Sequence, residues 1–231
     1  MRYFGFWRSL GQLAGSLWRA TIELLPSRRK ARFGDLDFDL EHDVDTTRSN
    51  VGFRAQFLAE LAGRPYFASE PWLFEEMMRA LPIRFQEFTF VDLGSGKGRA
   101  LLMAAPYGFR RITGVEFNPA WHQAAEENIR KYITSCSAEN KPAAAIESLC
   151  MDARDFEFPD GALVVYLFNP FSEPVLAAVL DRLRQSFLEN PRPVFVAYRY
   201  LEHEHLLKKS HWVEKVAGTE QWAVYKNRVI G

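Results

Sequence analysis

The sequence has few cysteines, no excess of charge of one sign and no long hydrophobic run, and each shortage excludes a class of protein. Its 231 residues include two cysteines, too few for a disulfide framework or a cysteine-rich zinc site, so we expect a reducing compartment and no metal site. No apolar run is long enough for a transmembrane helix. Because 29 acidic residues balance 29 basic ones, no overall field attracts nucleic acid, although a local basic patch stays open as an alternative.

The neutral total hides two oppositely charged segments near the N-terminus. Residues 1–32 hold seven Arg and Lys against the single acid Glu23, and residues 35–45 hold six acids. The acidic run is either a solvated linker or a cover for basic surface, and the sequence leaves both open.

Apolar residues within 1–25 recur at helical spacing, which predicts an amphipathic helix. Such a helix packs on the domain or a second subunit, or it lies on a membrane surface. We therefore divide the chain into an N-terminal helix and acidic linker over 1–49 and a folded domain over 50–231. The expected location is cytoplasmic, with membrane association through 1–25 as an open alternative.

Short apolar runs alternate with helical patterns in the domain, which predicts an α/β fold with a mostly parallel sheet covered on both faces. The last two strands are joined through Gly218 by a connection too short for a crossover helix, so they should be antiparallel to each other. Cys150 is expected to be a small core residue. The expected helices are 50–62, 69–81, 99–105, 118–132, 174–188 and 202–209, and the expected strands are 88–93, 112–117, 148–153, 162–168, 194–200, 211–216 and 222–226.

A glycine-rich loop, Asp92-Leu93-Gly94-Ser95-Gly96-Lys97-Gly98, follows the first strand and opens a helix. It is not a phosphate-binding P-loop, because Lys97 is followed by glycine instead of Ser or Thr. It also departs from the dinucleotide fingerprint, because its third glycine comes one residue early and Asp92 would repel a pyrophosphate. A carboxylate at this place suits a cationic or amino-bearing ligand.

Acids also follow the next two predicted strands. Glu116 ends the second strand, where a carboxylate can accept hydrogen bonds from both ribose hydroxyls of a nucleoside. Asp152 ends the third strand, where it can accept from the exocyclic amine of an adenine. Either acid is otherwise an ordinary surface carboxylate at a strand end.

Taken together, the glycine loop, Gly114-Val115-Glu116 and Asp152-Ala153 resemble the class I S-adenosylmethionine-dependent methyltransferases over roughly residues 66–226. The resemblance implies a Rossmann-like, seven-stranded sheet with a reversed last strand, and S-adenosylmethionine as cofactor. It implies that Asp92 lies near the cofactor's ammonium, Glu116 on its ribose and Phe117 against its adenine. The implied cofactor contacts are Asp92, Gly94, Ser95, Gly96, Gly98, Glu116, Phe117, Asp152, Ala153 and Asn169.

The fourth strand ends in Asn169-Pro170-Phe171, which is similar to the Asn/Asp-Pro-Pro-Tyr/Phe motif of methyltransferases that act on nitrogen, with one proline fewer. The similarity implies catalytic roles: Asn169 and a following carbonyl accept hydrogen bonds from the target amine, and Phe171 packs over it. The alternative is a strand-to-helix turn in which Asn169 caps the helix and Pro170 fixes the backbone.

The loop and Asn-Pro-Phe also resemble the non-SET protein-lysine methyltransferases, in which residues before the sheet close over the cofactor. Tyr66 and Glu70 occupy that place here, with a hydrophobic staple and a first-turn acid as the alternative. We therefore expect methylation of a protein lysine. The alternatives are a small-molecule or RNA methyltransferase on the same fold, and a catalytically inactive, cofactor-binding scaffold.

Overall fold

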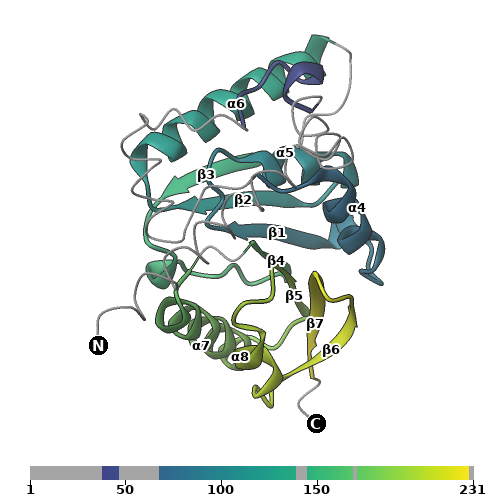
Figure 1. The fold of residues 1–231 in the computed structure, drawn as a ribbon, viewed down its shortest axis with the longest axis vertical. Coiled ribbons are helices and arrows are strands. Elements are labelled where there is room, and N and C mark those ends of the chain that lie inside the picture. The colour runs from purple at the N-terminus through teal and green to yellow at the C-terminus, as the bar shows by residue number, and fades with distance from the viewer. Residues whose placement is uncertain (1–37, 47–67, 139–144, 169–170, 229–231) are drawn as a thin grey trace, which may run out of the picture.

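A seven-stranded sheet forms the centre of the part of the chain that the computed structural model describes, namely residues 38–46, 68–138, 145–168 and 171–228 (Figure 1). The strand order is β3-β2-β1-β4-β5-β7-β6. The strands are β1 (Phe88–Leu93), β2 (Arg111–Glu116), β3 (Ile146–Cys150), β4 (Ala162–Phe168), β5 (Val194–Arg199), β6 (Val213–Gly218) and β7 (Trp222–Asn227).

The first five strands are parallel, whereas β7 pairs antiparallel with both β5 and β6. The predicted mostly parallel α/β sheet with an antiparallel last strand is therefore confirmed. The chain runs outward from β1 to β3 and then returns to add β4 on the other side of β1. This reversal makes the carboxyl ends of β1 and β4 a topological switch point, where ligands of open α/β sheets bind.

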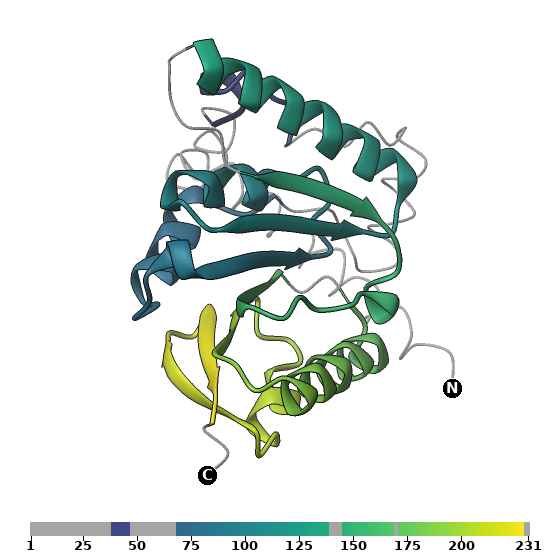
Figure 2. The same ribbon diagram turned by 180° about the vertical axis from the view of Figure 1, so that it is seen from behind.

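Helices cover both faces of the sheet (Figures 1 and 2). Alternate side chains of each strand face opposite clusters, as the two-residue strand period requires. Phe90 of β1 belongs to a core shared with α4, α5 and α6. Val91 and Leu93, which point to the other face of the sheet, belong to a core shared with α7 and α8. The helices are α4 (Pro71–Arg79), α5 (Arg99–Ala104), α6 (Pro119–Ala138), α7 (Glu173–Glu189) and α8 (Glu204–Lys208).

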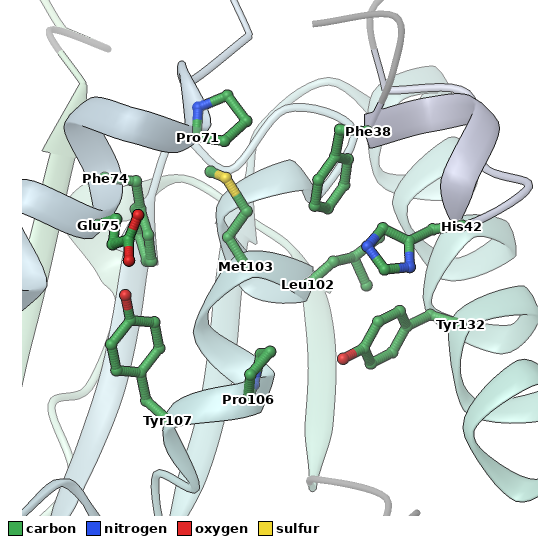
Figure 3. A pocket seen from close by; sticks show the side chains of 10 residues that line it. All are labelled: Phe38, His42, Pro71, Phe74, Glu75, Leu102, Met103, Pro106, Tyr107 and Tyr132. Atoms are coloured by element: carbon green, nitrogen blue, oxygen red, sulfur yellow. The ribbon is translucent and has the colours of Figure 1, made fainter. Parts of the chain in front are cut away.

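Residues 38–46 lie against the first of these faces, with a short helical turn at 38–41. Phe38 and His42 of this segment form one wall of an apolar pocket of about 400 Å³ (Figure 3). Other walls come from Phe74 of α4, Leu102 of α5 and Tyr132 of α6. Part of the predicted acidic linker therefore packs on the domain.

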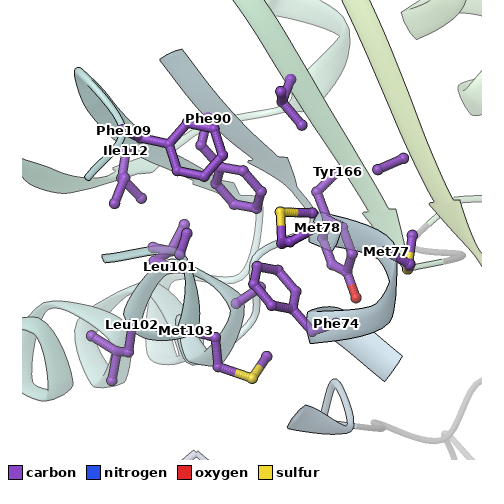
Figure 4. Packing of buried hydrophobic residues seen from close by; sticks show 14 of the residues in the cluster. Phe74, Met77, Met78, Phe90, Leu101, Leu102, Met103, Phe109, Ile112 and Tyr166 are labelled. Carbon is purple, nitrogen blue, oxygen red and sulfur yellow. The ribbon is translucent and has the colours of Figure 1, made fainter. Parts of the chain in front are cut away.

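Behind this pocket, large side chains of α4 and α5 fill the space above the sheet (Figure 4). Phe74 contacts Phe90 and Tyr166 edge-on, with ring centroids 5.9 and 5.4 Å apart. Met77 and Met78 are fully buried beside them. This packing holds the helix that follows Glu70 and the helix that follows the glycine loop on one rigid surface.

The expected amphipathic helix of residues 1–25 and the expected helix 50–62 lie outside the described residues. Within the described ranges, no helix is both long enough and apolar enough to cross a lipid bilayer.

Candidate functional site

The glycine loop between β1 and α5 has a backbone that only glycine adopts easily. Gly94, Gly96 and Gly98 have φ of 82°, 53° and 84°, in the left-handed region where a side chain is strained. The amides of Gly94 and Ser95 both donate to the carbonyl of Val115, at 2.8 and 3.0 Å. The loop is thereby fastened to the end of β2, at the switch point.

A second glycine requirement is steric and comes from β2. A Cβ on Gly114 would lie 2.6 Å from Leu101 Cδ1 and 2.8 Å from Ser95 Oγ. Only a residue without a side chain lets α5 and the loop approach β2 this closely.

The structure brings the two predicted acids of the first two strands together at this loop. Asp92 and Glu116 are only 4% and 5% exposed. Burial, together with the nearby carboxylate of Glu116, raises the pKa of Asp92 to about 8. A cation bound beside this carboxyl group, such as a sulfonium or ammonium, would favour its ionised form.

Glu116 holds the loop as well as facing the site. Its two carboxylate oxygens accept from the amide of Gly96 at 2.8 Å and from the amide of Asn118 at 2.7 Å. Burial raises the pKa of Glu116, while these backbone hydrogen bonds oppose the rise. A carboxylate has further lone pairs, so Glu116 can still accept from ribose hydroxyls.

Ser95 provides a test of whether a ligand fits this place. Its hydroxyl oxygen is buried and has no hydrogen-bond partner in the described part of the chain. A buried hydroxyl without a partner is costly, so a polar ligand that bonds to it would stabilise the loop. The left-handed glycines, the acid pair and this hydroxyl fit the predicted cofactor.

The predicted adenine contacts lie at the ends of β2 and β3, which the bond from the Met151 amide to the Glu116 carbonyl (3.1 Å) holds together. Asp152 accepts hydrogen bonds from the backbone and side chain of Arg154, which lower the pKa of Asp152. Ala153 is buried beside it, and the Phe117 side chain is 73% exposed. Phe117 is therefore free to lie against a flat ligand.

The predicted acceptor side is described only in part, because Asn169, Pro170 and Tyr66 lie outside the described residues. Phe171 packs against the apolar cluster under α7. Glu70 pairs with Arg199 at the end of β5, with an Nη2 to Oε1 distance of 3.3 Å.

The segment just before α4 is tied to β4 as well as to β5. Tyr166 of β4 donates its hydroxyl to Ser69 Oγ at 3.0 Å. Together with the Glu70–Arg199 pair, this bond ties residues 68–70 to β4 and to the end of β5. Whether this segment closes over a cofactor stays a prediction.

Two features of the structure were not predicted from the sequence. Lys97 and Arg99 are almost fully buried and point to acidic residues of 38–46. Tyr200, directly after β5, has φ of 63°, a strained value for a bulky residue. Only the acidic run at 35–45 hinted at the first feature, and nothing in the sequence indicated the second.

The expectation for Cys150 was wrong, because its side chain is exposed. Cys150 ends β3, the outermost strand of the sheet, where only one strand neighbour covers it. Among the described residues, no group of three or more His, Cys, Asp or Glu side chains is arranged to hold a metal ion.

Residues 91–184 match the family model described as a methyltransferase domain. The matched segment contains the glycine loop and the carboxyl ends of β2, β3 and β4. Methyltransferase domains of this kind use S-adenosylmethionine as the methyl donor. No curated protein matches the chain.

Solved structures similar to this chain include three methyltransferases. The precorrin-6y C5,15-methyltransferase of Geobacter metallireducens has a TM-score of 0.50 and 14% identity, over 70% of this chain and 90% of that one. An RNA methyltransferase from Salinibacter ruber, in complex with S-adenosyl-L-homocysteine, has 0.46 and 20%, over 70% and 92%. The N-methyltransferase NodS of Bradyrhizobium japonicum, also with S-adenosyl-L-homocysteine, has 0.47 and 12%, over 68% and 87%.

At such identities a likeness shows the fold alone. The strand order, the reversed β7 and the first of these alignments give the chain the Rossmann-like methyltransferase fold.

Proposed function

We propose that this protein is an S-adenosylmethionine-dependent methyltransferase that methylates a nitrogen atom, with the side chain of a protein lysine as acceptor. The observation that carries the proposal is the buried pair of Asp92 and Glu116 on either side of a left-handed glycine loop at the switch point of the sheet. The match of residues 91–184 to a methyltransferase domain supports it.

The residues of the loop would bind and orient the cofactor. Asp92 would face the cationic methionine part, Glu116 would accept from the ribose, and Ser95 would donate its hydroxyl hydrogen. When bound, S-adenosylmethionine supplies an already activated methyl group. The protein therefore has to hold the acceptor in line with that group, an orientation effect that reaches about 7–11 kcal/mol in favourable cases.

Nitrogen is proposed as the acceptor atom because Asn169-Pro170-Phe171, which follows β4 in the sequence, is similar to the motif of methyltransferases that act on nitrogen. The Asn169 side chain would accept a hydrogen bond from the target amine and turn its lone pair toward the methyl group. An amine attacks only in its neutral form, so exclusion of water or a nearby base has to remove its proton.

The deciding experiment incubates the full chain with methyl-labelled S-adenosylmethionine and a fractionated cell lysate. We expect label in protein and, after complete hydrolysis, in ε-N-methyllysine. Label in RNA or in small molecules would overturn the lysine proposal while keeping the methyltransferase activity.

Two variants separate binding from chemistry. Gly96→Arg fills the loop and should abolish cofactor binding measured by calorimetry, whereas Asn169→Ala should reduce methyl transfer far more than it weakens cofactor binding. A wild-type protein that binds the cofactor tightly but labels nothing would be a scaffold, and one that binds no cofactor would end the proposal.

A further inference from the structure

Five buried polar side chains connect residues 38–46 to the glycine loop and to α6. They are all less than a tenth exposed: Asp39, Thr46, Lys97, Arg99 and Asn128. Buried charges are costly unless they are paired, so a cluster of this size fixes the relative position of the elements that contribute to it.

Arg99, the first residue of α5, is held from three sides. Its Nε donates to Thr46 Oγ1 at 2.7 Å, and its Nη2 donates to Asp39 Oδ1 at 3.2 Å. The Asp39 carboxylate also accepts from the amide and hydroxyl of Thr46. The ring of Phe38 lies under the guanidinium, 5.1 Å from ring centroid to Cζ.

Asn128 of α6 connects the segment and the loop through their backbones. Its Nδ2 donates to the carbonyls of Asp45 and Lys97, both at 3.0 Å, and its Oδ1 accepts from the amide of Asp45 at 2.9 Å. Lys97 adds a charge contact, with its Nζ 3.3 Å from Asp45 Oδ1. The Asn128 side chain is therefore hydrogen-bonded to the backbone of residues 38–46 and to the backbone of the glycine loop.

Lys97 lies between Gly96 and Gly98, two of the three left-handed glycines of the loop. The amide of Gly96 binds Glu116, and Gly98 is the N-cap of α5. A shift of the Lys97 carbonyl would move both neighbours, because the peptide units are rigid. The Lys97 carbonyl is bonded to Asn128, and Asn128 is bonded in turn to the backbone of Asp45.

We infer that residues 38–46, hereafter the strap, position the glycine loop for cofactor binding, with Asn128 as the positioning residue that joins the two. The inference rests on the proposed function for its ligand. The chain leaves the strap at Thr46 and is described again from Ala68, next to the acceptor-side pair Glu70 and Arg199.

The test uses Asn128→Ala in the full chain, with Cys136→Ala as a matched control. Both residues are buried on α6, but Cys136 packs in the hydrophobic core away from the loop. We expect Asn128→Ala to raise the Kd for S-adenosylmethionine about tenfold, because two backbone carbonyls lose their donor. Cys136→Ala should alter thermal stability without changing the Kd.

Amide hydrogen exchange of the free protein gives a readout that needs no cofactor. Asn128→Ala should speed exchange in residues 94–98 and leave β5 at the wild-type rate. If Asn128→Ala changes neither loop exchange nor Kd more than Cys136→Ala does, the strap does not position the loop. Faster loop exchange in a protein that binds no S-adenosylmethionine would uphold the positioning role and refute the proposed function.

Discussion

At the residue scale, Asp92 is a buried acidic side chain of the site whose pKa is strongly raised. It lies in β1, directly opposite Gly114 of β2 and Tyr166 of β4. Burial and the neighbouring Glu116 raise its pKa to about 8, so near neutral pH the free protein keeps a proton on this carboxyl group. A bound cation would favour the ionised form instead.

Asp92→Asn should therefore stabilise the free protein at high pH. A group with a native pKa of about 8 and an ordinary value of 3.8 contributes stability that is fully present below about pH 4 and lost as the pH rises through 8. The asparagine variant lacks this loss. We expect similar unfolding free energies at about pH 4 and a variant more stable by roughly 1–4 kcal/mol at about pH 9, from denaturant titrations. Asp181→Asn, an exposed change on α7, should show no such trend.

The same carboxyl group predicts proton release on cofactor binding. If a cationic ligand lowers the pKa of Asp92, the wild-type protein should release about one proton at pH near 6.5, and affinity should rise with pH up to about 8. Calorimetry in two buffers of different ionisation enthalpy measures the proton count. Asp92→Asn should release none. Equal proton release in both proteins would place the titration on another group.

Single residues could be predicted where they belong to a local pattern. Asp92, Glu116 and the glycines lie within or directly after strands, so their spacing alone predicts that they meet. Lys97 pairs with Asp45 and Arg99 pairs with Asp39, each across more than 50 residues of chain. No periodic pattern in the sequence predicts these pairs. Such long-range pairs need the folded structure.

At the element scale, the bounds of buried strands were predicted more accurately than those of the edge strand β3 and of helix α6. The bounds of β1 and β4 were predicted correctly because both strands are short, mostly apolar segments, and β4 is a continuous apolar run. The edge strand β3 lies at 146–150 instead of 148–153, because Asp152 caps a short turn through the Arg154 amide. Helix α6 extends to Ala138, beyond the predicted Tyr132, because Ile133 and Cys136 continue its apolar face into the core.

Gly114→Ala tests the contact between α5 and β2. The added methyl group would lie 2.6 Å from Leu101 Cδ1, so the helix has to move or the core is overpacked. We expect a loss of about 1–3 kcal/mol in unfolding free energy and weaker cofactor binding. Gly161→Ala is the control, because the nearest atom to its Cβ is Arg110 Nη1 at 4.0 Å. If both variants unfold alike, the close approach has no energetic weight.

At the scale of the whole molecule, the charge asymmetry of the N-terminal region is explained in part. The sequence left open whether the acidic run is solvated or covers basic surface. Asp39 and Asp45 contact Arg99 and Lys97, so part of the run covers two basic side chains of the domain. The basic residues of 1–32 lie outside the described ranges, and their partner stays a prediction.

A deletion of residues 1–32 should separate the functions of the N-terminal region. These residues carry seven basic side chains against one acid and a helical apolar pattern, so the expected helix either packs on the domain or a second subunit or lies on an anionic lipid surface. The strap begins after them, so the deletion should leave the Kd for S-adenosylmethionine unchanged. Cosedimentation with vesicles containing anionic lipid should be lost on deletion, and in the wild type it should weaken with salt. If the wild-type chain does not cosediment with such vesicles, the apolar face of the expected helix has to be covered by the domain or by a second subunit.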